Sequence, residues 1–160
     1  MPEGLNSFSL RDLKSLTNGE FLDDNFSLGR YSTDASIYQI KPQGVLIPKN
    51  KKDIFNTIDF CLHNKISILP RGGGTSQCGQ TVNHSLVIDN SKNFNKVLHF
   101  DKEKQICIVE PGIVLDQLNN FLKPYGLWFP IDVSTSSRAT IGGMAGNNSC
   151  GGRSIKYGMM

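Results

Sequence analysis

Ten of the 16 glycines in this 160-residue chain lie in two short segments, four within residues 72–79 and six within residues 142–158. In the first segment, Gly72, Gly73 and Gly74 remove every β-carbon from three successive residues, so the backbone N–H groups can approach a ligand closely. A concave row of N–H donors suits an anion, above all a phosphate or pyrophosphate. The neighbouring side chains that can add donors are those of Arg71, Thr75, Ser76 and Gln80.

The first segment does not match the common phosphate-binding fingerprints. It lacks the lysine and the spacing of a P-loop, and after Gly72 and Gly74 the third Rossmann glycine is replaced by Gln77. A flexible turn between two strands is the structural alternative for a bare triple glycine. The flanking Pro70 and the Thr75-Ser76 pair favour a ligand site, because flexibility alone does not require them.

The second segment, residues 129–152, combines hydroxyls, amides and small residues with few charges. This composition suits a closely packed face on which a planar neutral ring lies flat, with N–H or amide donors at its edge. The alternative is a Ser/Gly-rich linker. A linker does not normally carry Ile141, Met144 and Ala145 between its glycines, so the segment is predicted to be structured.

The elements that position these segments can be predicted from apolar patterns. A short apolar run over residues 44–48 indicates a buried strand, and Asn50 is suited to cap a following helix. A second strand is expected over residues 66–69, which makes a βαβ unit and favours a parallel pair with a right-handed crossover. The predicted apolar stripe of the helix consists of Ile54, Phe55, Ile58 and Leu62.

Three more strands are predicted over residues 86–88, 97–100 and 106–109, the last two joined by a polar hairpin turn at 101–104. A second helix is expected over residues 114–123, with Leu115, Leu118, Phe121 and Leu122 on one face. The pattern predicts an α+β fold with mixed sheets and packed helices. Both glycine segments follow predicted strands, and loops on a rigid scaffold are where ligand contacts concentrate.

Residues 1–39 are expected to form an N-terminal extension, with one short helix through Phe8, Leu10, Leu13 and Leu16, and residues 40–160 the main domain. The net charge of +3 is too small to predict a nucleic-acid partner. The Lys49, Lys51 and Lys52 cluster fits a solvated helix start. No apolar run approaches the roughly 18 residues of a membrane span, and no secretory signal is evident.

The four cysteines, Cys61, Cys78, Cys107 and Cys150, are dispersed and form no C-x-x-C pair. The three histidines are equally scattered, so we expect no metal site. Dispersed thiols without a signal peptide predict a cytoplasmic protein.

Two long motifs in order carry a family resemblance: P-R-G-G-G-T-S-x-x-G-Q at 70–80 and S-S-R-A-T-I-G-G-M-A-G-N-N-S-C-G at 136–151. The chain resembles the FAD-binding domain of vanillyl-alcohol-oxidase/PCMH-type flavoproteins. It is most similar to the branch of FAD-linked oxidases that includes D-lactate, glycolate and D-2-hydroxyglutarate dehydrogenases. The resemblance extends to residues 31–36, 44–48 and 109–119.

This resemblance implies bound FAD, with the first segment around the pyrophosphate and the second beside the ribityl chain and flavin. Some family members attach the flavin to a histidine in the first loop; Thr75 stands at that place here, so noncovalent FAD is expected. The implied pyrophosphate contacts are Pro70, Arg71, Gly72, Gly73, Gly74, Thr75, Ser76 and Gln80. The implied contacts of the second segment are Ser134, Ser137, Thr140, Ile141, Gly142, Gly143, Gly146 and Asn147.

The implied chemistry is oxidation of a small 2-hydroxy acid by hydride transfer to FAD, followed by electron transfer to an acceptor that the sequence does not specify. In the family, substrate residues lie mainly in a later cap domain. The resemblance implies that this chain ends before the FAD domain is complete and before that cap, so no catalytic residue is assigned. Two alternatives stay open: a non-catalytic FAD-, nucleotide- or anion-binding module, and a purely structural glycine-rich domain.

Overall fold

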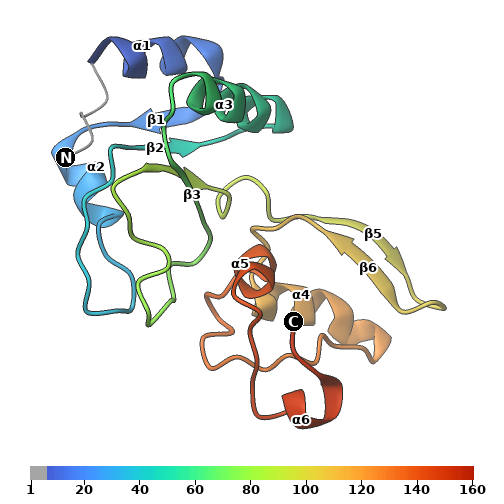
Figure 1. The fold of residues 1–160 in the computed structure, drawn as a ribbon. Coiled ribbons are helices and arrows are strands. Elements are labelled where there is room, and N and C mark those ends of the chain that lie inside the picture. Colours follow the sequence, from blue (N-terminus) through green and yellow to red (C-terminus); the bar gives the residue numbers. More distant parts are fainter. Residues whose placement is uncertain (1–6) are drawn as a thin grey trace. The chain divides into compact units, whose positions relative to one another are not determined.

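A computed structural model describes residues 7–160, with side chains from residue 12 onward (Figure 1). The chain forms two compact units, Met1–Asn93 and Phe94–Met160. The predicted α+β class with mixed sheets is confirmed: the first unit holds a four-stranded sheet, and the second a two-stranded one.

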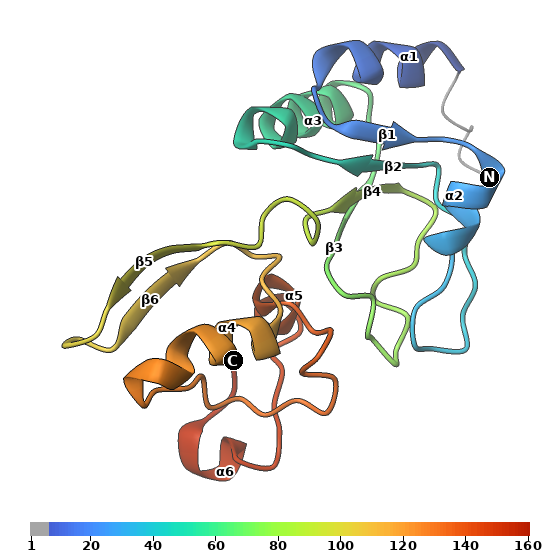
Figure 2. The same ribbon diagram turned by 180° about the vertical axis from the view of Figure 1, so that it is seen from behind.

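The sheet of the first unit has the strand order β1-β2-β4-β3 (Figure 2). Its strands are β1 (Glu20–Leu22), β2 (Gly44–Ile47), β3 (Ile68–Arg71) and β4 (Leu86–Asp89). β2 and β3 each pair with β4 in parallel, so the expected direct pairing of β2 with β3 is wrong: β4 lies between them. β1 pairs antiparallel with β2 and was not predicted.

Two helices lie together over one face of this sheet (Figure 1). α1 (Ser7–Leu16) contributes Leu13, and α3 (Lys51–His63) contributes Cys61, to a core that includes Leu86 of β4. α3 begins as predicted at Asn50, whose side chain accepts the N–H of Asp53 at 3.0 Å in a capping box.

The predicted packing face of α3 is wrong. Phe55, Ile58 and Leu62 are 64%, 43% and 74% exposed, whereas the buried residues of the helix are Asp53, Thr57 and Cys61. The buried residues are small or hydrogen-bonded: the Thr57 hydroxyl donates to the Asp53 carbonyl at 2.7 Å. The Asp53 carboxylate accepts the N–H groups of Asn18 and Lys49 at 2.9 and 2.8 Å, which fixes this face inward.

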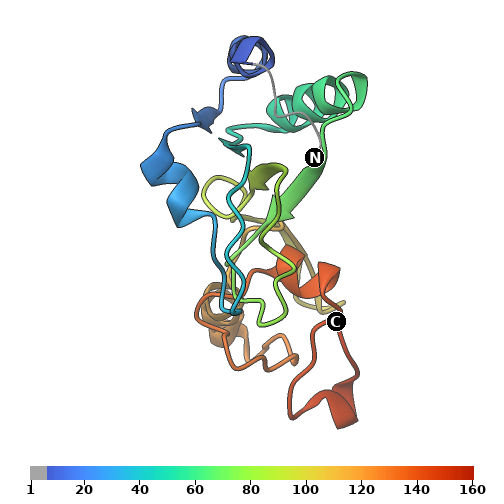
Figure 3. The ribbon, with the colours of Figure 1, turned by 60° about the vertical axis from the view of Figure 1, so that its left-hand side comes forward.

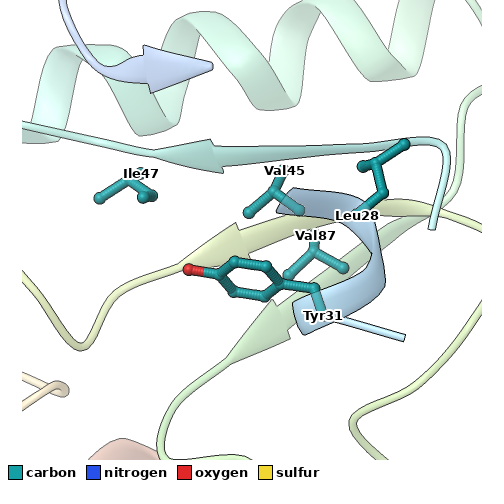
Figure 4. Packing of buried hydrophobic residues seen from close by; sticks show 5 residues of the cluster. All are labelled: Leu28, Tyr31, Val45, Ile47 and Val87. Atoms are coloured by element: carbon teal, nitrogen blue, oxygen red, sulfur yellow. The ribbon is translucent and has the colours of Figure 1, made fainter. Parts of the chain in front are cut away.

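The opposite face of the sheet is covered by α2 (Asn25–Arg30) and the residue that follows it, Tyr31. Figure 4 shows the Tyr31 ring against the valines of β2 and β4, with Leu28 of α2 beside them. The Asp24 side chain caps α2 by accepting the N–H of Ser27 at 2.9 Å. Leu28 and Tyr31 thus pack in one core with Val45, Ile47 and Val87 of β2 and β4.

The second unit begins with the antiparallel hairpin of β5 (Val97–Asp101) and β6 (Ile106–Val109), as predicted. The hairpin packs on α4 (Leu115–Leu122), which continues into a 3₁₀ turn over Lys123–Tyr125. Two short helices follow, α5 (Ile141–Gly146) and α6 (Ser154–Tyr157). The contact is apolar: Val97, Phe100, Cys107 and Val109 of the hairpin pack against Leu118 and Leu122 of α4, together with Ile113, which lies between β6 and α4.

Across the described residues, no helix has both the length and the apolar character needed to cross a membrane.

Candidate functional site

The first glycine segment forms a loop that leaves the end of β3 and returns to β4. It runs beside residues 31–43, the segment that joins α2 to β2 (Figure 3). Gly74 and Gly79 have φ angles of +64° and +75°, a left-handed conformation that other residues adopt only with strain. A β-carbon on Gly79 would also lie 2.6 Å from the Tyr38 ring. Glycine at both positions is therefore explained by the loop's own geometry.

The loop retains free backbone donors. Within residues 7–160, the N–H groups of Gly73, Gly74 and Thr75 donate to no other residue. Three successive unpaired donors on a glycine loop match the chemistry of a phosphate oxygen. This first unit therefore fits a phosphate-bearing ligand by its own atoms.

Ser76 and Gln80 hold the far side of the loop. The Ser76 hydroxyl donates to Gln80 Oε1 and accepts the N–H groups of Cys78 and Gln80 at 3.2 and 3.3 Å. These contacts close a local turn, so both predicted ligand residues also shape the loop. Thr75 lies between this turn and the glycines and is half-buried.

Arg71, at the end of β3, directs its guanidinium to the protein's own backbone. Nη1 donates to the carbonyls of Tyr31 and Thr81 at 3.2 and 2.9 Å, and Nη2 donates to the carbonyl of Thr33 at 2.8 Å. Burial lowers the pKa of Arg71, while the nearby Asp34 and Asp89 oppose this shift.

Two carboxylates flank the guanidinium and anchor the surrounding segments. Asp34 accepts the Ser36 N–H at 2.8 Å and the Thr81 hydroxyl at 2.9 Å. Burial would raise the pKa of Asp34, but the hydrogen bonds from Ser36 and Thr81 outweigh it and lower the pKa. Asp89, buried at the end of β4, accepts the Tyr31 hydroxyl at 2.6 Å.

The second glycine segment is structured, as predicted. Thr140 is buried and caps α5, because its hydroxyl accepts the Gly143 N–H at 3.3 Å. Met144 of α5 is buried with Leu115 and Ile131 in a core cluster. A flexible linker is inconsistent with these contacts.

Close packing within the second unit explains two of its glycines. The Gly142 N–H donates to the Pro111 carbonyl at 2.8 Å, and a β-carbon on Gly142 would lie 2.5 Å from Pro111 Cβ. A β-carbon on Gly151 would lie 2.2 Å from the Asp132 carbonyl oxygen. Their small size serves the protein's own packing. By contrast, a β-carbon on Gly146 would meet nothing within 4 Å.

The sequence-predicted residues differ in accessibility. Thr140 is buried. Arg71, Gly72, Gly74, Thr75, Ser76, Ile141 and Gly142 are half-buried. Pro70, Gly73, Gln80, Ser134, Ser137, Gly143, Gly146 and Asn147 are exposed.

Sequence reasoning did not assign Tyr31, Asp34 or Asp89 to the site. Tyr31 and Asp34 lie in the segment 31–36 that carries part of the family resemblance, which was a usable signal. The sequence carries no such signal for Asp89, because a carboxylate at the end of an apolar strand is common on protein surfaces.

No cluster of three metal-ligating side chains occurs among the residues that the structure describes. The four cysteines are free thiols. Burial raises the pKa of the Cys61 thiol to about 11.

The fold is of the mixed α+β class, and a glycine loop with free N–H donors follows one of its parallel strands. These features define a domain suited to a phosphate-bearing cofactor. The sequence profile of the family described as FAD binding domain matches residues 42–160. The chain belongs to this FAD-binding family.

Curated relatives agree with this assignment. The chain is 41% identical over 130 residues to D-2-hydroxyglutarate dehydrogenase of Haemophilus influenzae, a match that spans 79% of this chain and 13% of that protein. It is 36% identical over 141 residues to the glycolate oxidase subunit GlcD of Bacillus subtilis, spanning 85% of this chain and 30% of that subunit. The chain thus corresponds to a minor part of each relative.

Solved structures share the fold at low sequence identity. An alkyldihydroxyacetonephosphate synthase matches 99% of this chain and 32% of its own, with a TM-score of 0.84 and 21% identity. A p-cresol methylhydroxylase matches 93% of this chain and 31% of its own, with a TM-score of 0.73 and 17% identity. These similarities confirm the predicted PCMH-type fold.

Proposed function

We propose that this chain is the FAD-binding portion of a larger enzyme that oxidises a 2-hydroxy acid. The main observation in support is the family match over residues 42–160, a range that includes the glycine loop with its three free N–H groups. The relatives named D-2-hydroxyglutarate dehydrogenase and glycolate oxidase subunit support the 2-hydroxy-acid class. The start of the family match at residue 42 supports a boundary near residue 40 between extension and FAD-binding domain.

The first glycine loop would hold the FAD pyrophosphate. The free N–H groups of Gly73, Gly74 and Thr75 supply the donors, and Ser76 and Gln80 keep the loop closed. The remaining proposed residues of this loop are Pro70, Arg71 and Gly72.

The second segment would contact the ribityl chain and the flavin. Exposed small and polar groups on and before α5 support this role, since they let a flat ring approach the backbone. The proposed contacts are Ser134, Ser137, Thr140, Ile141, Gly142, Gly143, Gly146 and Asn147. Of these, Thr140 and Gly142 also maintain the local fold, through the α5 cap and the packing on Pro111.

Bound FAD would supply the two-electron oxidant for converting a 2-hydroxy acid into a 2-oxo acid. This chain's own part is to bind and orient the cofactor. Noncovalent binding is proposed because Thr75 provides no ring nitrogen for a flavin bond. We also propose a cytoplasmic location, which the four free thiols support.

FAD binding can be tested on the chain itself. FAD is added in excess, the protein is desalted, and the retained flavin absorbance and the melting temperature are measured. A ligand at a hundred times its Kd stabilises a protein by about 2.7 kcal/mol, which corresponds to a Tm increase of roughly 5–10 °C for a chain of this size. Gly73→Val should reduce retention, whereas Gly29→Val, at an open position on α2, should not. Desalted protein with neither flavin bands nor a Tm shift would contradict the proposal.

The reaction requires the longer protein. With FAD bound and oxygen excluded, D-2-hydroxyglutarate, D-lactate and glycolate are added separately, and the loss of visible flavin absorbance is followed. Bleaching by one of them supports the dehydrogenase. FAD binding without bleaching by any 2-hydroxy acid would favour a non-catalytic FAD-binding module.

A further inference from the structure

The Arg71 side chain joins three parts of the first unit that are far apart in sequence. Its hydrogen bonds reach Tyr31 and Thr33, which follow α2, and Thr81, which ends the glycine loop. Arg71 itself begins that loop. A single guanidinium therefore ties the two ends of the loop together across ten residues.

The same guanidinium also lies against the backbone of the loop at Gly74. A β-carbon on Gly74 would lie 2.6 Å from Arg71 Nη2 and 3.1 Å from Cζ, so the Gly74 backbone lies directly against the guanidinium. The Tyr31 ring also lies close to the guanidinium, with Cζ 5.4 Å from the centre of the ring. Tyr31 is in turn fixed by its 2.6 Å hydrogen bond to Asp89.

Two carboxylates, Asp34 and Asp89, oppose the lowering of the Arg71 pKa by burial. Asp34 accepts hydrogen bonds from Thr81, one of the residues whose carbonyl the guanidinium binds. Asp89 stands opposite Arg71 in the β3–β4 register. At least three of the five guanidinium N–H groups are used on backbone carbonyls.

We propose that Arg71 is a positioning residue: its guanidinium closes the base of the glycine loop and supports Gly74, so that the free N–H groups of Gly73, Gly74 and Thr75 are pre-arranged for the FAD pyrophosphate. The inference rests on the proposed function for the identity of the ligand. It assigns the Arg71 guanidinium an action through the loop backbone, in place of the direct pyrophosphate contact that the family resemblance implies for Arg71.

The loop itself can be tested without FAD. Arg71→Met keeps an unbranched side chain but removes all donors, and Arg71→Lys keeps the charge but replaces the planar fork with a point donor. Both variants should accelerate amide hydrogen exchange at Cys78, Gln80 and Thr81, the loop residues whose N–H groups are hydrogen-bonded, by tenfold or more, while exchange in β2 and β4 stays within twofold of the wild type. Unchanged exchange in the loop of either variant would overturn the proposal.

A second test measures the Kd for FAD in a double-mutant cycle that combines Arg71→Met with substitutions of Gly74 and Gly79. Gly74→Ala should raise the Kd for FAD at least tenfold in the wild-type background and by a clearly smaller factor in the Arg71→Met background, because the clash disappears with the guanidinium while the strain of the positive φ remains. Gly79→Ala is the matched control, since it has a similar positive φ but its β-carbon would meet Tyr38. Its penalty should be the same in both backgrounds.

Two results would refute the role in binding: an Arg71→Met protein whose Kd for FAD stays within twofold of the wild type, or a Gly74→Ala penalty that does not change between backgrounds. A wild-type chain that binds no FAD would refute the proposed function instead. The exchange measurement would then still decide whether Arg71 positions the loop.

Discussion

Tyr31→Phe removes one oxygen atom from the core of the first unit and leaves the rest of the ring in place. The lost hydroxyl donates to Asp89 Oδ2 at 2.6 Å, and both residues are buried, at 6% and 5% exposure. The other carboxylate oxygen of Asp89 is held by the N–H and hydroxyl of Ser91 at 2.8 and 2.6 Å. The substitution therefore leaves Oδ2 without that donor.

The expected cost follows from this geometry. A hydrogen bond to a charged group contributes about 1.5–3 kcal/mol, and no cavity forms because phenylalanine fills the same space. We expect the free energy of unfolding at pH 7 to fall by about 2 kcal/mol. For a chain of this size the melting temperature should fall by roughly 4–8 °C.

The pH dependence gives an independent check. Burial, then the hydrogen bond to Asp89 and its negative charge, raise the pKa of Tyr31 above its usual value near 10. Because the pKa is raised in the folded state, the contribution is fully present below pH 10 and is lost as the pH rises toward the folded-state value. The stability difference between wild type and Tyr31→Phe should thus be constant from pH 7 to 9 and narrow above pH 10.

Urea unfolding followed by circular dichroism at a series of pH values measures this difference. Tyr38→Phe is the matched control: its hydroxyl has no hydrogen-bond partner among residues 7–160, so its stability should stay within about 0.5 kcal/mol of the wild type. A Tyr31→Phe protein as stable as this control at pH 7, or a difference that widens at alkaline pH, would refute the reasoning.

Other substitutions test the remaining packing arguments. Asp53→Ala should cost about 3 kcal/mol in urea unfolding, because backbone donors from two segments lose a buried carboxylate, whereas Asp59→Ala on the exposed side should change little. Gly142→Ala should cost about 1–3 kcal/mol through its overlap with Pro111, while Gly146→Ala, in open space on α5, should be neutral or stabilising; a thermal scan compares the two. The Cys61 thiol should react with a thiol reagent last of the four, since it is buried and its pKa is raised; labelling it as fast as the exposed thiols would contradict its burial.

The sequence predicted the elements of the fold better than their contacts. Apolar runs located β2, β3 and β4, but the insertion of β4 between the other two depends on long-range pairing that no local pattern records. On α3 the apolar residues do recur with the period of a helix, but the face that they form is the exposed one and not the buried one. The helix turns Asp53 and Thr57 inward because hydrogen bonds from Asn18 and within the first turns satisfy them, which outweighs the burial of larger side chains.

For the candidate site, glycine clustering located both segments but did not reveal why each glycine is there. Gly74 and Gly79 need positive φ, and free N–H groups lie beside Gly74. Gly142 is required by contact with Pro111, a residue of another loop, and only a three-dimensional structure shows such a contact.

Some glycines are required by the protein's own packing and others are not, and this decides which substitutions can report on cofactor binding. A side chain on Gly142 or Gly151 must displace Pro111 or Asp132, so a loss of FAD affinity there would be inseparable from a loss of folding. Gly146 has open space around its α-carbon, and the β-carbon of an alanine at Gly143 would meet only the Thr140 hydroxyl at 3.0 Å. Larger residues at Gly146 are therefore the substitutions in this segment whose effect on flavin binding can be measured against an unchanged fold, whereas a side chain at Gly143 presses on the α5 cap.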